Sequence, residues 1–118
     1  MIHRRKRGDE YWVLVGGGVE EGETEEEALA REVMEETSFQ LKNYIRDTEA
    51  EENGTHHVLY FCESEQEEPV LGGPEKEANN PDNWYNPEWV EISTVAAFTD
   101  VYPMLVTKWA EKWLKDNI

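Results

Sequence analysis

The chain has 118 residues, which suits one domain with a buried core, and we expect a single domain over residues 1–118. Hydrophobic residues make up 38% and aromatic residues 11%, which excludes a disordered composition. No apolar run is long enough to span a bilayer, so we expect no membrane contact. The single cysteine excludes an intramolecular disulfide framework and favours a cytoplasmic location. A net charge of −16 disfavours binding to duplex nucleic acid.

The first predicted elements are two strands, over residues 2–7 and 11–15, joined by a turn at Gly8 and Asp9. Glycines at positions 16–18 end the second strand. Thr24, with a glutamate three residues later, forms a capping box and predicts a helix from about residue 25 to residue 37.

The second half of the chain alternates strands with polar connections. We predict strands at residues 40–48 and 56–63, on either side of a turn at Asn53 and Gly54, and a short strand at residues 89–92. Residues 64–88 contain four prolines and predict a long functional loop. Ser93 or Thr94 is expected to cap a helical turn, and a last helix should begin near Pro103, with its tryptophans in the core. This order predicts an α+β fold, arranged as an α/β/α sandwich with helices on the faces of a mixed sheet.

The first helix places three glutamates on one side. The residues expected to face the sheet are Leu29, Ala30, Val33 and Thr37. Glu32, Glu35 and Glu36 lie on the adjoining side, where like charges three and four residues apart each cost a few tenths of a kcal/mol. A divalent cation such as Mg²⁺ or Mn²⁺ would remove that repulsion. The alternative is a solvated acidic face.

The spacing of these residues resembles the signature of the Nudix hydrolases, in particular of MutT-like members. The matching positions are Gly17, Glu23 after five residues, Arg31 and Glu32 after seven more, then Val33, Glu35, Glu36 and Phe39. A looser similarity covers Arg4, Arg5, Tyr11, Trp12, residues 72–75, Asn83, Tyr85, Pro87, Trp89 and Val90. The resemblance implies the Nudix fold and metal-dependent hydrolysis of a nucleoside diphosphate linked to another moiety.

The resemblance also implies roles for individual residues. The metal ligands would be Glu32, Glu35 and Glu36, with Arg31 orienting them and Glu23 in the same network. The base would be Glu32 or an acid on a distant loop, for which the candidates are Glu75 and Glu77. Further substrate-binding candidates are Arg4 or Arg5 at a phosphate, the backbone of Gly17 and Gly18, and Tyr85 at a base. For the two arginines, solvated strand cations are the open alternative, and for Tyr85 it is anchoring of the loop.

Three departures from the family pattern leave other functions open. Ser38 stands at the second glycine of the signature, where a left-handed residue is expected and costs roughly 1 kcal/mol. Val15 stands where proline is common. The chain opens where the sheet of other members is already under way, which predicts an N-terminal truncation, a missing first strand and an exposed edge that a second copy could cover. These features motivate a nucleotide-binding module without catalysis as the alternative, and an acidic interaction domain as a third possibility.

Overall fold

The computed structural model describes residues 1–64 and 67–117, which form six strands and four helices. The strands are β1 (Ile2–Lys6), β2 (Asp9–Val13), β3 (Asn43–Glu52), β4 (Thr55–Glu63), β5 (Asn83–Pro87) and β6 (Val101–Tyr102). The helices are α1 (Glu25–Thr37), α2 (Gly73–Ala78), α3 (Ile92–Ala96) and α4 (Leu105–Asp116). None of these helices is long and apolar enough to cross a bilayer.

Both hairpins are closed by two-residue turns with positive φ at both positions, the geometry that matches the twist of paired strands. The turn between β3 and β4 is at Asn53 and Gly54 (φ 51° and 80°), as predicted. The turn between β1 and β2 is at Arg7 and Gly8 (φ 51° and 86°), one residue earlier than predicted. For that reason β2 begins and ends two residues before the predicted strand.

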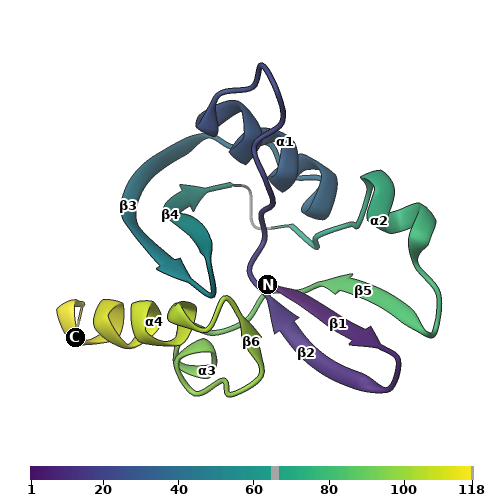
Figure 1. Ribbon diagram of the computed structural model, residues 1–118. Helices are drawn as coiled ribbons and strands as arrows, with labels where there is room; N and C mark the ends of the chain where they lie inside the picture. Colours follow the sequence, from purple (N-terminus) through teal and green to yellow (C-terminus); the bar gives the residue numbers. More distant parts are fainter. Residues whose placement is uncertain (65–66, 118) are drawn as a thin grey trace.

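The strands form a mixed four-stranded sheet in the order β5-β1-β2-β6 and a separate two-stranded sheet, β3-β4. β1 is antiparallel to both of its neighbours, and β2 is parallel to β6. The β3-β4 hairpin lies between α1 and α4 (Figure 1). The open edges of the larger sheet are β5 and β6, and a further strand before β1 stays a prediction.

The register of the larger sheet separates two neighbouring arginines. Arg4 lies opposite Tyr11 and Tyr85, and Arg5 lies opposite Glu10 and Trp84. Because successive side chains of a strand point to opposite faces, Arg4 and Arg5 belong to different surfaces.

The predicted helix α1 has the predicted bounds and its capping box. The Thr24 hydroxyl accepts from the Glu27 amide at 3.1 Å, and the Glu27 carboxylate accepts from the Thr24 amide at 3.3 Å. Its buried face differs from the prediction: Ala30 is exposed, and Glu32 and Glu36 are buried beside Val33. The two glutamates therefore point into the protein.

The region from residue 64 to residue 88 is more structured than predicted, apart from residues 65 and 66, which lie outside the described residues. It contains α2 and the edge strand β5, because β5 pairs with β1, far away in sequence. The strand predicted at residues 89–92 is wrong, since Ile92 begins α3 without a side-chain cap from Ser93 or Thr94.

The apolar core lies between α3, α4 and the β6 edge of the sheet. Its buried members are Val95, Val101, Val106 and Ala110. The tryptophans of α4 were predicted as core, but Trp113 is 37% exposed and Trp109 is half-buried against Phe61, with ring centroids 4.8 Å apart. The α4 helix therefore buries small residues and leaves its large rings at the hairpin side.

Candidate active site

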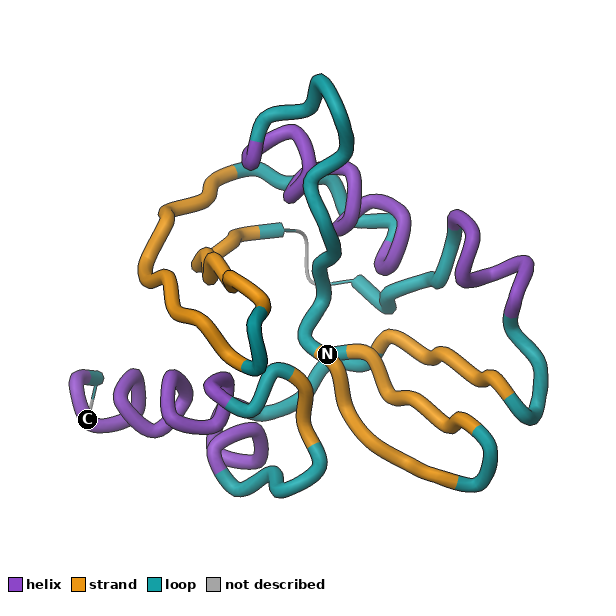
Figure 2. Tube along the Cα trace, viewed as in Figure 1, coloured by secondary structure: helices purple, strands orange, loops and turns teal. Residues whose placement is uncertain are grey.

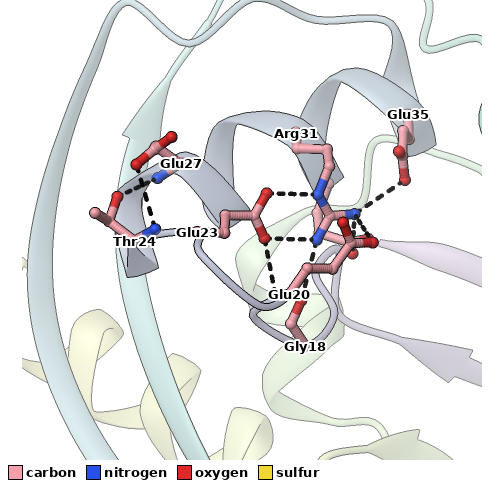
Figure 3. Close-up of polar contacts among 8 residues, drawn as sticks. Gly18, Glu20, Glu23, Thr24, Glu27, Arg31 and Glu35 are labelled. Atoms are coloured by element: carbon pink, nitrogen blue, oxygen red, sulfur yellow. Dashed lines mark hydrogen bonds and ion pairs between the residues drawn. The ribbon is translucent and has the colours of Figure 1, made fainter.

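A long connection carries the glycines from β2 to α1, where it runs beside the helix (Figures 1 and 2). It ends in an arginine-centred network on α1 (Figure 3). Arg31 donates from Nε and Nη2 to the two carboxylate oxygens of Glu23, at 2.8 and 3.0 Å. Its Nη1 donates to Glu32 at 2.8 Å and to Glu35 at 3.4 Å, and its Nη2 also donates to the Gly18 carbonyl at 3.0 Å. One guanidinium thus joins the glycine connection to the acids of the helix.

The bonds in this network have electrostatic consequences. The hydrogen bond from Arg31 holds the pKa of Glu23 below its ordinary value. Hydrogen bonding to Glu23 likewise raises the pKa of Arg31, which stays charged. Arg31 and Glu23 therefore form an ion pair that joins the middle of α1 to the connection before it, in the geometry that bidentate arginine–carboxylate pairs favour.

The pKa values of the two buried glutamates, Glu32 and Glu36, are shifted in the opposite direction to that of Glu23. Burial raises the pKa of Glu36 to about 8, although its Oε1 accepts a hydrogen bond from the Gly16 amide at 2.6 Å. Burial also raises the pKa of Glu32, against the effect of Arg31. The charges of Glu32 and Glu75 raise the pKa of Glu36 further, so these carboxylates repel one another electrostatically.

The backbone passes very close to Glu32 at one glycine. A Cβ built on Gly17 would lie 2.5 Å from Glu32 Oε1, whereas a Cβ on Gly18 would meet no atom within 4 Å. Only glycine therefore accommodates the Glu32 carboxylate where Arg31 holds it.

A second pair of glycines brings the distant loop to the same place. The Gly72 amide donates to the Glu35 carbonyl at 2.6 Å, and Gly73 has φ 63°, where an added Cβ would lie 3.1 Å from the Glu35 side chain. α2 begins there and places the Glu75 side chain inward, with Oε2 buried and without a hydrogen-bond partner among the described residues. Glu77 is exposed on the same short helix. Of the two predicted loop acids, the structure thus brings Glu75 to the buried glutamates.

Of the acids described above, Glu36 and Glu75 line a cavity of about 430 Å³ on one face of the larger sheet. Its lining residues are Ile2, Arg4, Tyr11, Val13, Glu36, Glu75, Tyr85 and Tyr102. Arg4 is only 6% exposed, its Nη2 donates to Asn83 Oδ1 at 2.9 Å, and its guanidinium lies 3.5 Å from the centroid of the Tyr85 ring. Within the described part of the chain Arg4 has no carboxylate ion partner. A buried cation therefore lies in the same cavity as two carboxylates.

Arg5, the other predicted phosphate contact, lies elsewhere. Its guanidinium stacks 4.6 Å from the Trp84 ring centroid and lies 3.9 Å from Glu10. It lines a separate cavity of about 350 Å³ on the opposite face of the sheet. The structure does not bring Arg5 to the acids.

Sequence reasoning did not identify three groups of the site: the Gly16 amide, Asn83 and Tyr102. Gly16 could have been included with its neighbours, since it belongs to the same glycine run. Asn83 was named only in the looser family similarity, without a role, and Tyr102 had no signal, because their positions depend on strands β5 and β6 pairing with distant segments.

The donor set has the chemistry that a hard divalent cation requires. Glu32, Glu36 and Glu75 offer carboxylate oxygens whose mutual repulsion a cation would relieve, and the buried Glu75 Oε2 has no partner among the described residues. As placed, no three His, Cys, Asp or Glu side chains of the described residues form a ready metal-binding group. One reason is that the Glu35 carboxylate accepts a hydrogen bond from Arg31. To bind a cation, this carboxylate would have to turn away from Arg31.

The fold and this arrangement of acids define a Nudix domain, and a sequence model of the NUDIX domain matches residues 1–105. The chain belongs to the Nudix family. Such hydrolases generally use divalent cations.

Proteins similar in sequence match a short part of the chain. A segment of 41 residues is 56% identical to the NAD-capped RNA hydrolase NudC of Pectobacterium atrosepticum, covering 35% of this chain and 15% of that protein. NudC of Pectobacterium carotovorum subsp. carotovorum matches with the same identity and coverage. The matched segment thus spans a small fraction of these relatives.

Two solved structures share the fold over nearly the whole chain. One is MutT, from a study of the Aliivibrio salmonicida and Vibrio cholerae proteins, with a TM-score of 0.67 and 18% identity, covering 96% of this chain and 86% of that one. The other is a Nudix hydrolase family member from Chromobacterium violaceum, with a TM-score of 0.59 and 16% identity, covering 97% and 67%. At these identities the likeness concerns the fold alone.

Proposed function

We propose that this protein hydrolyses a pyrophosphate bond in a nucleoside diphosphate linked to another moiety, with Mg²⁺ or Mn²⁺ as cofactor. The observation that carries the proposal is the cavity in which buried Glu36 and half-buried Glu75 share the walls with buried Arg4. The match of the NUDIX domain to residues 1–105 supports the same reaction class.

In this proposal the glutamates bind the cation and Arg31 orients them. Glu32, Glu35 and Glu36 would hold the cation, which when bound neutralises charge on the pyrophosphate and acidifies water. Arg31 keeps Glu32 oriented through the 2.8 Å hydrogen bond, and Glu23 fixes Arg31 in turn.

The remaining steps need a base and an anion contact. Glu75 is the better candidate for the base, because its Oε2 is free of hydrogen bonds from the described residues, whereas Arg31 already donates to Glu32 Oε1. Arg4 would bind a phosphate oxygen through guanidinium N–H groups that Asn83 leaves free. Attack by water then needs positioning and charge stabilisation, and no nucleophilic side chain.

The partner we propose is a small nucleoside diphosphate derivative, without duplex nucleic acid or membrane, and a cytoplasmic location agrees with the composition. NAD-capped RNA, the substrate named for NudC, is a larger molecule whose cap contains the same kind of pyrophosphate linkage. A homodimer and the single domain over residues 1–118 stay predictions, testable by light scattering and limited proteolysis.

The test is product release from a panel of nucleoside triphosphates, ADP-sugars, dinucleotides and capped oligonucleotides, with EDTA, Mg²⁺ or Mn²⁺. We expect metal-dependent turnover that Glu35→Gln abolishes. Glu26→Gln, which changes an exposed acid of the same helix, should leave turnover intact.

Two other outcomes would replace the proposal. Metal and nucleotide that raise the melting temperature without any turnover would favour the nucleotide-binding module. A melting temperature insensitive to Mg²⁺ and Mn²⁺ beyond ionic-strength effects would favour the acidic interaction domain.

A further inference from the structure

A histidine outside the predicted site has an unexplained buried atom. The Nε2 atom of His57 is buried and has no hydrogen-bond partner among the described residues. Buried polar atoms are almost always hydrogen-bonded, so an exception in a native fold calls for a ligand or another explanation. The Nε2 atom of His57 can therefore form a hydrogen bond with a ligand.

The position of His57 on β4 differs from that of its neighbour. His57 points to the same side of the strand as Leu59, which is 3% exposed. His56 points to the other side, is exposed, and contacts Glu49 at 3.0 Å. Two adjacent histidines thus have opposite surroundings, which makes one a natural control for the other.

His57 adjoins the cavity through an aromatic ring. The rings of His57 and Tyr102 meet edge to face, with centroids 5.7 Å apart and planes at 74°. Tyr102 lines the cavity and is 45% exposed, and a turn of its ring is the movement that access to the buried Nε2 atom from the cavity would require.

The cavity has two chemically different ends. Tyr102 belongs to β6 and Tyr85 to β5, the two edges of the four-stranded sheet. At the β5 end, Tyr85 is covered by the Arg4 guanidinium, a group that binds anions. At the β6 end, Tyr102 offers a half-exposed ring in edge-to-face contact with the His57 ring. The acids Glu36 and Glu75 supply the carboxylates of the same cavity.

We infer that His57 and Tyr102 form the nucleobase-binding end of the cavity. An aromatic ring provides a stacking surface for any base, and an imidazole nitrogen can donate to or accept from a base edge. The base would lie at the β6 end, and the second, phosphate-bearing moiety would lie toward Arg4. This orientation rests on the proposed function, although base binding itself does not require turnover.

The test compares two ligands that differ only in the presence of a nucleoside. Affinities for ADP and for inorganic pyrophosphate would be measured by calorimetry, with Mg²⁺, in the wild-type protein and three variants. His57→Phe keeps an aromatic ring but removes the ring nitrogens, Tyr102→Ala removes the Tyr102 ring, and His56→Ala is the control. Circular dichroism would establish that each variant is folded.

We expect His57→Phe and Tyr102→Ala each to weaken ADP binding about tenfold and to change pyrophosphate binding less than twofold. His56→Ala should change neither by more than twofold. Where turnover is measurable, His57→Phe should raise KM about tenfold and leave kcat within threefold.

The inference is overturned if the wild-type protein does not bind ADP, or if His57→Phe and Tyr102→Ala bind ADP like the wild type. It is also overturned if the two variants weaken ADP and pyrophosphate equally, since the residues would then act on phosphate. If the expected binding pattern appears in a protein that hydrolyses nothing, the proposed function fails while the base-binding end stands.

Discussion

Replacing Glu36 with glutamine should stabilise the metal-free protein while removing its function. Burial raises the pKa of Glu36 to about 8, compared with an ordinary value of 4.5. Above pH 4.5 the unfolded chain loses this proton and the folded protein retains it, so stability falls as the pH rises toward 8. The fall should be about 1.4 kcal/mol per pH unit for one proton.

The size of the effect follows from the same values. The difference between 8 and 4.5 corresponds to an upper bound of about 5 kcal/mol above both pKa values. Relaxation around the carboxylate will reduce this, so we expect Glu36→Gln to gain roughly 2–4 kcal/mol at pH 8.5. Glutamine Oε1 can still accept the hydrogen bond from the Gly16 amide.

The assay is urea unfolding in EDTA at several pH values between 5 and 8.5, beside Glu26→Gln as the exposed control. The advantage of Glu36→Gln over the wild type should grow across this range, and addition of Mn²⁺ should stabilise the wild type and Glu26→Gln but not Glu36→Gln. A difference that is constant with pH, or a less stable Glu36→Gln protein at pH 8.5, would refute the assignment of Glu36 as a carboxyl group destabilised by burial.

Three further substitutions test separate contacts. Arg4→Met should lower kcat/KM about tenfold to hundredfold, because a charged hydrogen bond to a phosphate is lost. Gly17→Ala should lower kcat about a hundredfold with little loss of stability, because the added Cβ displaces the Glu32 carboxylate. Glu52→Ala should cost about 1–2 kcal/mol of unfolding free energy, because its carboxylate accepts from the Met104 and Leu105 amides at 2.8 and 2.9 Å and caps α4.

Each of these substitutions has a matched control. Lys108→Met removes an exposed cation from α4 and should leave kcat/KM unchanged within twofold. Gly18→Ala adds a Cβ in open space and should affect kcat far less than Gly17→Ala. Glu51→Ala removes the exposed neighbour of Glu52 and should change stability by under about 0.5 kcal/mol. Equal effects within a pair would contradict the contact in question.

Local signals in the sequence were sufficient where a few neighbouring residues determine the structure. The capping box at Thr24 located α1, and Asn53 with Gly54 located the second hairpin turn. Ser38 has φ 65°, as expected at the helix end, and its hydroxyl donates to the Val70 carbonyl at 2.7 Å. That bond offsets part of the cost of the left-handed conformation, so this departure from the family pattern leaves the helix end intact.

The sequence was insufficient where structure depends on contacts between distant segments. Strand β5 has no alternating apolar pattern, and its pairing with β1 is what makes it a strand. The distinction between Arg4 and Arg5 depends on the face to which each points, which the register determines. The distinction between Glu75 and Glu77 depends on Gly72 and Gly73 packing against Glu35. The periodicity of apolar residues also predicted the wrong buried face for α1. Such a prediction assumes that buried positions are apolar, whereas Glu32 and Glu36 are buried in this helix.

The most direct test of the central claim is hydrolysis in H₂¹⁸O, followed by ³¹P NMR, with ADP-ribose and ATP as substrates and with Mg²⁺ or EDTA. The account predicts cleavage of the phosphoanhydride bond only with Mg²⁺, with one ¹⁸O atom on a phosphorus of one product, and no cleavage by Glu35→Gln. Absence of Mg²⁺-dependent cleavage across the substrate panel, or products without ¹⁸O, would contradict it.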